Sequence, residues 1–360
     1  MENLRVLELY SGIGGMHCAL KESRAPAEVV AAVDVNTTAN DVYRHNFPNT
    51  PLWAKTIEGL TLDDFNKLEF DMILMSPPCQ PFTRIGLQGD VSDPRAKSFL
   101  YILDLLPRLS KRPRFLLLEN VKGFETSSAR DALVKTLKDC GYSYQEFLLS
   151  PTCLGIPNSR LRYFLIARAM PGSFSFQATA EQILEGFPKS AKGDYADPAP
   201  VPIHCPPSAG SSIEGGEDPG VPGGGGGGEV EEREYLLPPK TLLRYALLLD
   251  IVRPTCRRSV CFTKGYGHYV EGTGSVLQSR TDTKVEKAFA SLDSLSEEQK
   301  LSQLSTLGLR YFTPREIANL MGFPADFSFP EKTSIKQRYR VLGNSLNVRV
   351  VAKLIELMVA

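Results

Sequence analysis

The chain has 360 residues, 42% of them hydrophobic, and its 41 Lys and Arg side chains balance its 41 Asp and Glu side chains. A zero formal net charge argues against a uniformly basic nucleic-acid coat protein and against an acidic disordered chain. No apolar run approaches the roughly 18–20 residues of a membrane span. The seven cysteines are odd in number and scattered, which favours reduced thiols inside the cell. We therefore expect the protein in the cytoplasm, and in the nucleus as well. No membrane partner is expected.

The first 170 residues alternate short apolar runs with helical patterns, which predicts a parallel α/β architecture. Helices are predicted at residues 98–109 and 128–140. Continuous runs such as ILM and FLLL favour strands that helices cover on both faces. The predicted strands cover residues 5–10, 28–33, 70–75, 115–118, 144–149 and 163–167.

Residues 186–234 are predicted to form a flexible, acidic linker rich in Gly and Pro. Residues 193–228 contain 11 Gly and 7 Pro and end in six consecutive glycines. This composition disfavours both helices and sheets, and it offers too little apolar surface to offset the entropy of ordering. We interpret the segment as a tolerated surface insertion.

The chain after the linker returns to a globular composition. Residues 240–252 and 314–321 have helical patterns, and residues 260–276, rich in Gly and Tyr, are expected to be β. The last helix, residues 346–358, needs a partner for its apolar stripe, and the first domain is the expected one. That stripe consists of Val348, Val351, Ala352, Ile355 and Met358.

Residues 10–15 (YSGIGG) lie where a predicted strand leads into a helix. Glycines let the backbone approach a ligand at the carboxyl edge of a sheet, where α/β folds bind cofactors. Asp34 follows the next strand and can accept hydrogen bonds from ribose hydroxyls. The third glycine of a dinucleotide fingerprint is replaced by His17, so the pattern favours a nucleotide-like cofactor other than NAD, or else a simple tight turn.

Residues 76–82 (SPPCQPF) directly follow another predicted strand. The flanking prolines would hold the Cys79 thiol at the same edge of the sheet, facing the cofactor. A catalytic thiol needs electropositive surroundings, because a free one is mostly protonated near neutral pH. The alternative is a small buried hydrophobic residue, although prolines are unusual material for a core.

Glu119 and the pair Arg160 and Arg162 complete the set of polar candidates. Glu119, at the end of an apolar strand, is either a general acid or base with a raised pKa or a solvated loop residue. The two arginines, spaced at period two, suit a pyrimidine carbonyl or a phosphate. Surface salt bridges are the alternative for each.

The order of these four motifs, followed by residues 343–345 (GNS), resembles the cytosine-5 methyltransferases. The resemblance implies that Cys79 attacks C6 of cytosine while Glu119 hydrogen-bonds and protonates N3. Arg160 and Arg162 would orient the base and the adduct. The attack would make C5 nucleophilic enough to take a methyl group from S-adenosylmethionine, and loss of the C5 proton and the thiol would restore the ring.

The same resemblance assigns a set of residues to the cofactor. Asp34 would hold the ribose, with Val35 beside the base, although many relatives have Glu where Asp34 stands. Ser76 would begin the loop of the nucleophile. The other residues assigned to S-adenosylmethionine are Tyr10, Gly12, Ile13, Gly14, Gly15, Ile57, Glu58, Asn344 and Ser345.

The substrate expected from the resemblance is RNA. Residues 261–275 (CFTKGYGHYVEGTGS) resemble the signature of a branch of small animal enzymes that methylate tRNA-Asp in the anticodon loop. Loop bases are already unstacked and cost less to place in a pocket than duplex bases. Residues 235–360 carry 18 basic against 11 acidic side chains, a local basic excess that the total hides.

Three alternatives remain open at this stage. The first is a methyltransferase that acts on DNA, and the second is a catalytically silent nucleic-acid-binding protein of the same fold. The third is a nicotinamide-dependent oxidoreductase, which the missing third glycine disfavours. A metal site is not expected, because Cys256 and Cys261 have no second pair at zinc spacing.

The predicted fold is a doubly wound, Rossmann-like α/β methyltransferase domain with a smaller target-recognition domain, in a monomer. Residues 1–185 and 335–360 would form the catalytic part, and residues 235–334 the recognition domain. The nucleic acid would lie in the cleft between them. Residues 83–97 would form a lid over the base.

Overall fold

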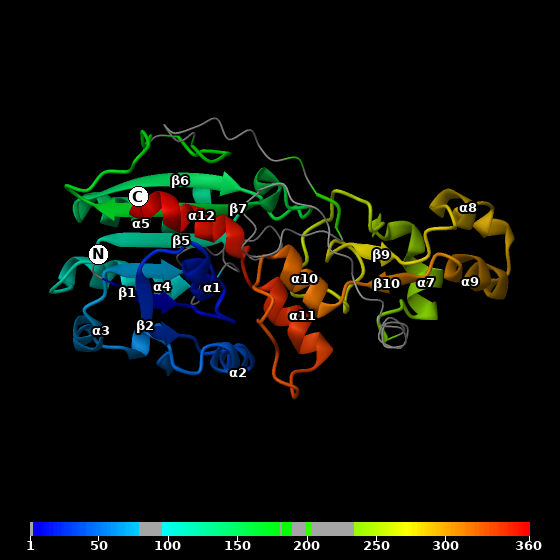
Figure 1. The fold of residues 1–360 in the computed structure, drawn as a ribbon, viewed down its shortest axis with the longest axis horizontal. Coiled ribbons are helices and arrows are strands. Elements are labelled where there is room, and N and C mark those ends of the chain that lie inside the picture. Colours follow the sequence, from blue (N-terminus) through cyan, green and yellow to red (C-terminus); the bar gives the residue numbers. More distant parts are fainter. Residues whose placement is uncertain (1–2, 79–95, 181, 189–198, 200, 204–233) are drawn as a thin grey trace, which may run out of the picture.

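The computed structural model describes residues 3–78, 96–180, 182–188, 199, 201–203 and 234–360. The predicted nucleophile Cys79, nearly all of the predicted lid and most of the predicted linker lie outside these residues. Two sheets organise the rest (Figure 1). The larger one and its helices occupy one end of the molecule, and the smaller one occupies the other.

The larger sheet has seven strands in the order β3-β2-β1-β4-β5-β7-β6. All six strands predicted from the apolar runs are present, and only the two-residue β3 was missed. Neighbouring strands from β3 to β5 are parallel. The strands are β1 (Leu4–Leu9), β2 (Ala27–Val33), β3 (Leu52–Trp53), β4 (Met72–Met75), β5 (Phe115–Val121), β6 (Tyr142–Leu149) and β7 (Arg162–Ala169).

Strand β7 departs from the predicted parallel sheet, because it runs antiparallel to both β5 and β6. The connection from β6 to β7 contains only the short 3-10 helix η7 (Pro151–Leu154). A parallel pair needs a longer crossover, usually through a helix, so a short connection returns the chain in the opposite direction. The start of β7 consequently lies at the same edge of the sheet as the end of β5.

Helices cover both faces of the large sheet, as the apolar runs predicted. Alternate residues of β1 pack on opposite sides, with Val6 in one core cluster and Leu7 and Leu9 in the other. The first cluster includes α1 (Gly15–Glu22), α2 (Thr37–Asn46) and α12 (Val348–Val359). The second includes α3 (Leu62–Leu68), α4 (Lys97–Leu105) and α5 (Ser128–Asp139).

The last helix, α12, returns to the large sheet and packs against α1, β5 and β7. Figure 1 shows it in red beside α1. Every member of the predicted apolar stripe is buried. Asn347 caps the helix by accepting a hydrogen bond from the N–H of Val350 at 3.1 Å.

The smaller sheet has the order β10-β9-β8. A separate hydrophobic cluster joins this sheet to the helices around it, and α10 and α11 lie between the two ends of the molecule (Figure 1). The elements are β8 (Ile251–Val252), β9 (Val276–Gln278), β10 (Leu309–Tyr311), α7 (Pro239–Tyr245), α8 (Val285–Phe289), α9 (Glu297–Ser305), α10 (Pro314–Leu320) and α11 (Ile335–Gly343).

Two sequence predictions in this part of the chain are wrong. The helix expected at residues 240–252 ends with the 3-10 helix η8 (Ala246–Leu248), because Ile251 and Val252 pair with β9. Residues 260–275 form turns instead of β structure. Gly267 and Gly272 there have φ angles of 74° and 68°, a left-handed conformation that reverses the chain.

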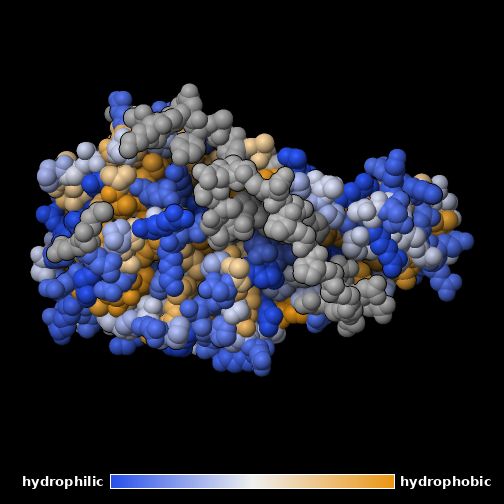
Figure 2. All heavy atoms as spheres, in the orientation of Figure 1, coloured by the Kyte–Doolittle hydropathy of each residue, from blue (hydrophilic) through white to orange (hydrophobic). Residues whose placement is uncertain are grey.

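The hydropathy of the surface differs between the two ends of the molecule. On the face drawn in Figure 2, hydrophilic residues predominate over the part that contains α8 and α9. None of the helices in the described residues is both long enough and apolar enough to cross a membrane.

Candidate functional site

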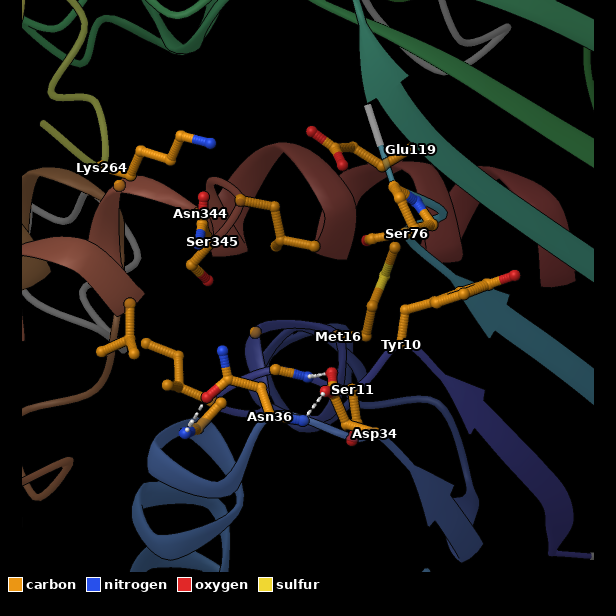
Figure 3. Close-up of a pocket in the computed structure, with 18 of the residues that line it drawn as sticks. Tyr10, Ser11, Met16, Asp34, Asn36, Ser76, Glu119, Lys264, Asn344 and Ser345 are labelled. Carbon is orange, nitrogen blue, oxygen red and sulfur yellow. Dashed lines mark hydrogen bonds between the residues drawn. The ribbon is translucent and has the colours of Figure 1, made fainter. Parts of the chain in front are cut away.

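A cavity of about 380 Å³ opens at the carboxyl ends of β1, β2, β4 and β5. This is the edge at which open α/β sheets bind ligands. Segments from both ends of the chain form its wall, as Figure 3 shows. The predicted site residues on the wall are Tyr10, Gly12, Ile13, Gly15, Asp34, Val35, Ser76, Glu119, Arg160, Arg162, Asn344 and Ser345.

Four predicted residues are not placed on the wall. Gly14 faces Phe47, and a Cβ atom on Gly14 would lie 2.3 Å from that ring. Ile57, in the 3-10 helix η1 (Ile57–Gly59), is buried in the core, while Glu58 beside it is exposed. Cys79 lies outside the described residues, but Pro78, immediately before it, is on the wall.

The glycine turn after β1 is held in place by Asp34. One carboxylate oxygen of Asp34 accepts a hydrogen bond from the N–H of Gly12, and the other accepts one from the N–H of Asn36, both at 2.8 Å (Figure 3). Gly12 has a φ of 52°, which favours glycine. The carboxylate thus joins the turn after β1 to the segment that leads into α2.

The turn also contacts the C-terminal segment closely. A Cβ atom on Gly15 would lie 2.9 Å from Oγ of Ser345 and 3.0 Å from the side chain of Leu346. Only a residue without a side chain allows this approach. The two segments that the sequence assigns to the cofactor are therefore packed together on one side of the cavity.

Glu119 supplies the carboxyl group of the site from the end of β5. Burial raises its pKa, and the positive charges of Arg162 and Arg160 partly oppose that effect. Nε of Arg162 lies 3.6 Å from one carboxylate oxygen. Because β7 is antiparallel to β5, Arg162 at its first position and Glu119 near the end of β5 share one edge of the sheet. A carboxyl group with a raised pKa can act as a proton donor near neutral pH.

Arg160 is buried and already bound on several sides. Its guanidinium donates hydrogen bonds to the carbonyls of Phe262 at 3.1 Å and Gly343 at 3.2 Å, and to that of Ser345. These bonds tie the segment before β7 to two segments far along the chain. Arg160 therefore holds the wall together, whereas Arg162 is the arginine that pairs with Glu119.

Cys261 adds a thiol beside the two arginines. Its Sγ lies 3.4 Å from Nη1 of Arg160 and 3.7 Å from Nη2 of Arg162. Burial alone would raise the pKa of the thiol, but the two positive charges outweigh burial and lower it. The two predicted arginines thus make the surroundings of this thiol, just behind the wall residues Arg160 and Arg162, electropositive.

The structure adds wall residues that the sequence did not single out as site residues. Asn120 donates from Nδ2 to the carbonyl of Pro77 at 3.4 Å, and it belongs to the same motif as Glu119. Lys264 faces Glu119 across the cavity (Figure 3) and lies within the segment 261–275 that carried the resemblance. Arg340, on α11, had no local signal that could have identified it.

The wall fits a nucleotide-like cofactor that has both polar and apolar parts. Ser11 on the wall has a fully buried Oγ with no hydrogen-bond partner within the described residues, so a ligand could bond with it. Val35 is 59% exposed although it is hydrophobic, as expected for a side chain that a flat ring would cover. Within the described residues, no group of three or more His, Cys, Asp or Glu side chains could hold a metal ion.

Comparison with known proteins places this geometry in context. The model of the family "C-5 cytosine-specific DNA methylase" matches residues 4–193 and 245–360. A Bos taurus protein named tRNA (cytosine(38)-C(5))-methyltransferase is 58% identical over 99% of this chain and 100% of the relative. A Dictyostelium discoideum protein named DNA (cytosine-5)-methyltransferase is 37% identical over 100% of this chain and 95% of its own length.

The solved structures agree with the curated relatives. A crystal structure of a Spodoptera frugiperda DNMT2 mutant superposes with a TM-score of 0.83 at 42% sequence identity, covering 99% of this chain and 100% of that one. The similarity therefore includes both sheets. The gap in the family match, residues 194–244, overlaps most of the predicted linker.

Proposed function

Since this chain belongs to the family of C-5 cytosine-specific DNA methylases, we propose that the cytosine it methylates lies in tRNA, at position 38 in the anticodon loop of tRNA-Asp. The observation that carries the proposal is the full-length, 58% identity to a relative named for that position. The chain itself is a cytosine-5 methyltransferase, and what the proposal adds is the substrate and the roles of the residues.

The charges of the site support an RNA substrate. Lys264 and Arg340 bring two positive charges to the wall of the cavity, where a phosphate of the bound strand could pair with them. Residues 235–360 carry 18 basic against 11 acidic side chains. A base in an anticodon loop is already unpaired, so it enters a cavity without the cost of opening a duplex.

The cofactor proposed for the glycine turn is S-adenosylmethionine, which the family implies. When bound, it supplies an electrophilic methyl group. Gly12 and Ile13 would lie along it, and Asp34, which already holds the turn, has carboxylate lone pairs left for ribose hydroxyls. Asn344 and Ser345, packed against the turn at Gly15, would complete the same side of the cofactor site.

The proposed chemistry begins with two groups acting together on the base. The Cys79 thiolate would form a bond to C6 of cytosine while Glu119 transfers a proton to N3. Burial keeps the carboxyl of Glu119 available as a proton donor by raising its pKa, and Arg162 beside it would orient the base. After C5 has gained its methyl group, a base would take the C5 proton, the thiolate would leave C6 and N3 would return its proton to Glu119, which restores the aromatic ring.

Duplex DNA is the second candidate substrate. The observation that favours it is the Dictyostelium discoideum relative, which is 37% identical over the full chain and is named a DNA (cytosine-5)-methyltransferase. Its identity is lower than the 58% of the relative named for tRNA. RNA is therefore the substrate we propose.

Incubation with radiolabelled S-adenosylmethionine tests the proposal, with tRNA and duplex DNA offered separately. We expect label in tRNA-Asp and none in a transcript whose cytosine 38 is replaced by uridine. Cys79→Ala should abolish the label, while Cys153→Ala, a partly exposed thiol away from the wall, should keep it. Label in DNA but not in tRNA would overturn the substrate, and label with Cys79→Ala would overturn the nucleophile.

A further inference from the structure

An exposed aromatic side chain lies in the loop that follows a residue of the cavity wall. Tyr269 is 64% exposed, and among the described residues it is the only aromatic one in the set of large exposed hydrophobic side chains. The ring of His268 meets it edge to face, with ring centroids 4.5 Å apart. Both belong to the loop that follows Lys264 on the cavity wall. The exposed ring offers a ligand a large, rigid, flat apolar surface with a polar hydroxyl at its end.

The base of this loop is fixed to the core through Tyr266. Its hydroxyl donates a hydrogen bond to the carbonyl of Ser275 at 2.6 Å and accepts one from the N–H of Phe312 at 2.9 Å. Gly274 gives the ring its space, since a Cβ atom there would lie 2.6 Å from Tyr266. The loop therefore presents its outer residues from a rigid foundation.

The backbone that carries the Tyr269 ring is held in place. The backbone N–H of Tyr269 donates to the carbonyl of Gly265 at 2.9 Å, and its backbone carbonyl accepts from Oγ1 of Thr273 at 2.8 Å. A Cβ atom on Gly265 would lie 3.0 Å from Cδ2 of the ring, so the ring rests against the backbone of the residue that follows Lys264. A ring that is already ordered loses little conformational freedom when a ligand covers it.

We propose that Tyr269, with His268 at its edge, is a stacking surface for an unpaired RNA base that neighbours the target cytosine. This inference rests on the proposed tRNA substrate. Single-stranded loops are bound by stacking their bases on aromatic side chains, because every base offers a flat π face. Lys264 lies on the cavity wall and directly precedes Gly265, which the ring contacts, so it can pair with the phosphate that joins the stacked base to the target. Bases in a duplex are already stacked on one another, so this surface favours a loop.

The test measures methylation of an anticodon stem-loop RNA by Tyr269→Ala and Tyr269→Phe. We expect Tyr269→Ala to raise KM by about 5- to 150-fold, the range of losing one base–aromatic stack, with little change in kcat. Tyr269→Phe keeps the ring and should behave like the unaltered protein. Leu247→Ala removes an exposed side chain in η8 and is the matched control. The affinity of Tyr269→Ala for S-adenosylhomocysteine should be unchanged, which shows that its cavity is intact.

A second substrate series identifies the base. Replacing the nucleotide on the 5′ or the 3′ side of the target by an abasic one should raise the KM of the unaltered protein. It should not raise the KM of Tyr269→Ala above the value that this variant has on the intact RNA. Equal KM values for Tyr269→Ala and the unaltered protein on the intact RNA would overturn the stacking surface and leave the proposed function standing. Failure of the unaltered protein to methylate the RNA would overturn both.

Discussion

Two carboxyl groups near the cavity have pKa values raised by burial, and they serve different purposes. Glu119 faces the cavity beside Arg162. Glu8 lies behind the glycine turn, where it accepts hydrogen bonds from the Tyr43 hydroxyl at 2.7 Å and the His17 N–H at 3.3 Å. At the scale of single residues, the first group is the one that we propose as the proton donor, and the second joins β1, α1 and α2 behind the proposed cofactor site.

Glu119→Gln should lower kcat for RNA methylation by about 100- to 10,000-fold, because an amide cannot transfer a proton to N3. Cofactor binding should be preserved, since Gln has nearly the same shape. Single-turnover methylation and calorimetric binding of S-adenosylhomocysteine would measure the two effects. Glu297→Gln, on the distant α9, is the control, and equal rates for both variants would show that Glu119 is not the proton donor.

Glu8→Gln should alter how stability depends on pH. Burial raises the pKa of Glu8 from 4.5 to about 8, against the hydrogen bonds from Tyr43 and His17. Between these values the folded protein keeps a proton that the unfolded chain has released, so Glu8 makes stability fall as pH rises. The loss is about 1.4 kcal/mol per pH unit within the window. Glutamine keeps an oxygen that can accept the hydrogen bond from the backbone N–H of His17, and it does not ionise. The free energy of unfolding of Glu8→Gln should therefore lack this dependence on pH.

Urea unfolding at pH 6 and pH 7 would test this prediction. The free energy of unfolding of the unaltered protein should fall by about 1.4 kcal/mol relative to Glu8→Gln over that step. Parallel pH dependences for the two proteins would mean that Glu8 is already ionised in the fold. Glu271→Gln, a surface change in the loop of Tyr269, should leave the slope intact.

At the scale of elements, strand pairing and side-chain packing set the ends of helices that local sequence patterns did not predict. Helix α7 stops because Ile251 and Val252 are needed as a strand beside β9. Helix α5 is locked to β6 by an ion pair, in which Arg130 binds both carboxylate oxygens of the buried Glu146, at 2.7 and 2.5 Å. The hydroxyl of Tyr163 on β7 donates to the same carboxylate at 2.7 Å.

Removal of one partner of this pair should be costly. Arg130→Ala leaves Glu146 buried without its cation and should lower the free energy of unfolding by about 3 kcal/mol. The matched control is Lys135→Ala on the same helix, whose exposed ion pair with Asp139 is worth less than about 1 kcal/mol. Similar urea midpoints for the two variants would contradict the prediction. Combining Arg130→Ala with Glu146→Gln should recover part of the loss.

At the scale of the whole molecule, the cavity exists only because the two ends of the chain meet. Helix α12 packs on α1, and Gly15 approaches Ser345 so closely that a methyl group would not fit. The first core cluster continues from the large sheet to Phe262 and Phe312, beside the small sheet. A ligand in the cavity should therefore stabilise distant parts of the sequence together.

S-adenosylhomocysteine at 100 times its Kd should stabilise the protein by about 2.7 kcal/mol. Amide hydrogen exchange should slow in α1, α2 and the segment 343–346 alike, because all three border the same cavity. Adenosine alone at the same concentration is the comparison ligand and should protect less. Protection confined to α1 and α2 would show that the C-terminal segment does not contribute to the site.

The amino-acid sequence by itself determined the family, the strands of the large sheet and most of the cavity wall. Apolar runs and short motifs are local signals, and motifs that follow strands such as β1, β4 and β5 meet wherever the strands share an edge. The tertiary structure alone decided that β7 runs antiparallel, which brings Arg162 to Glu119. It also decided that Lys264 and Arg340 reach the same wall. Such contacts join residues far apart in the chain, and they depend on how whole elements pack, which no local pattern records.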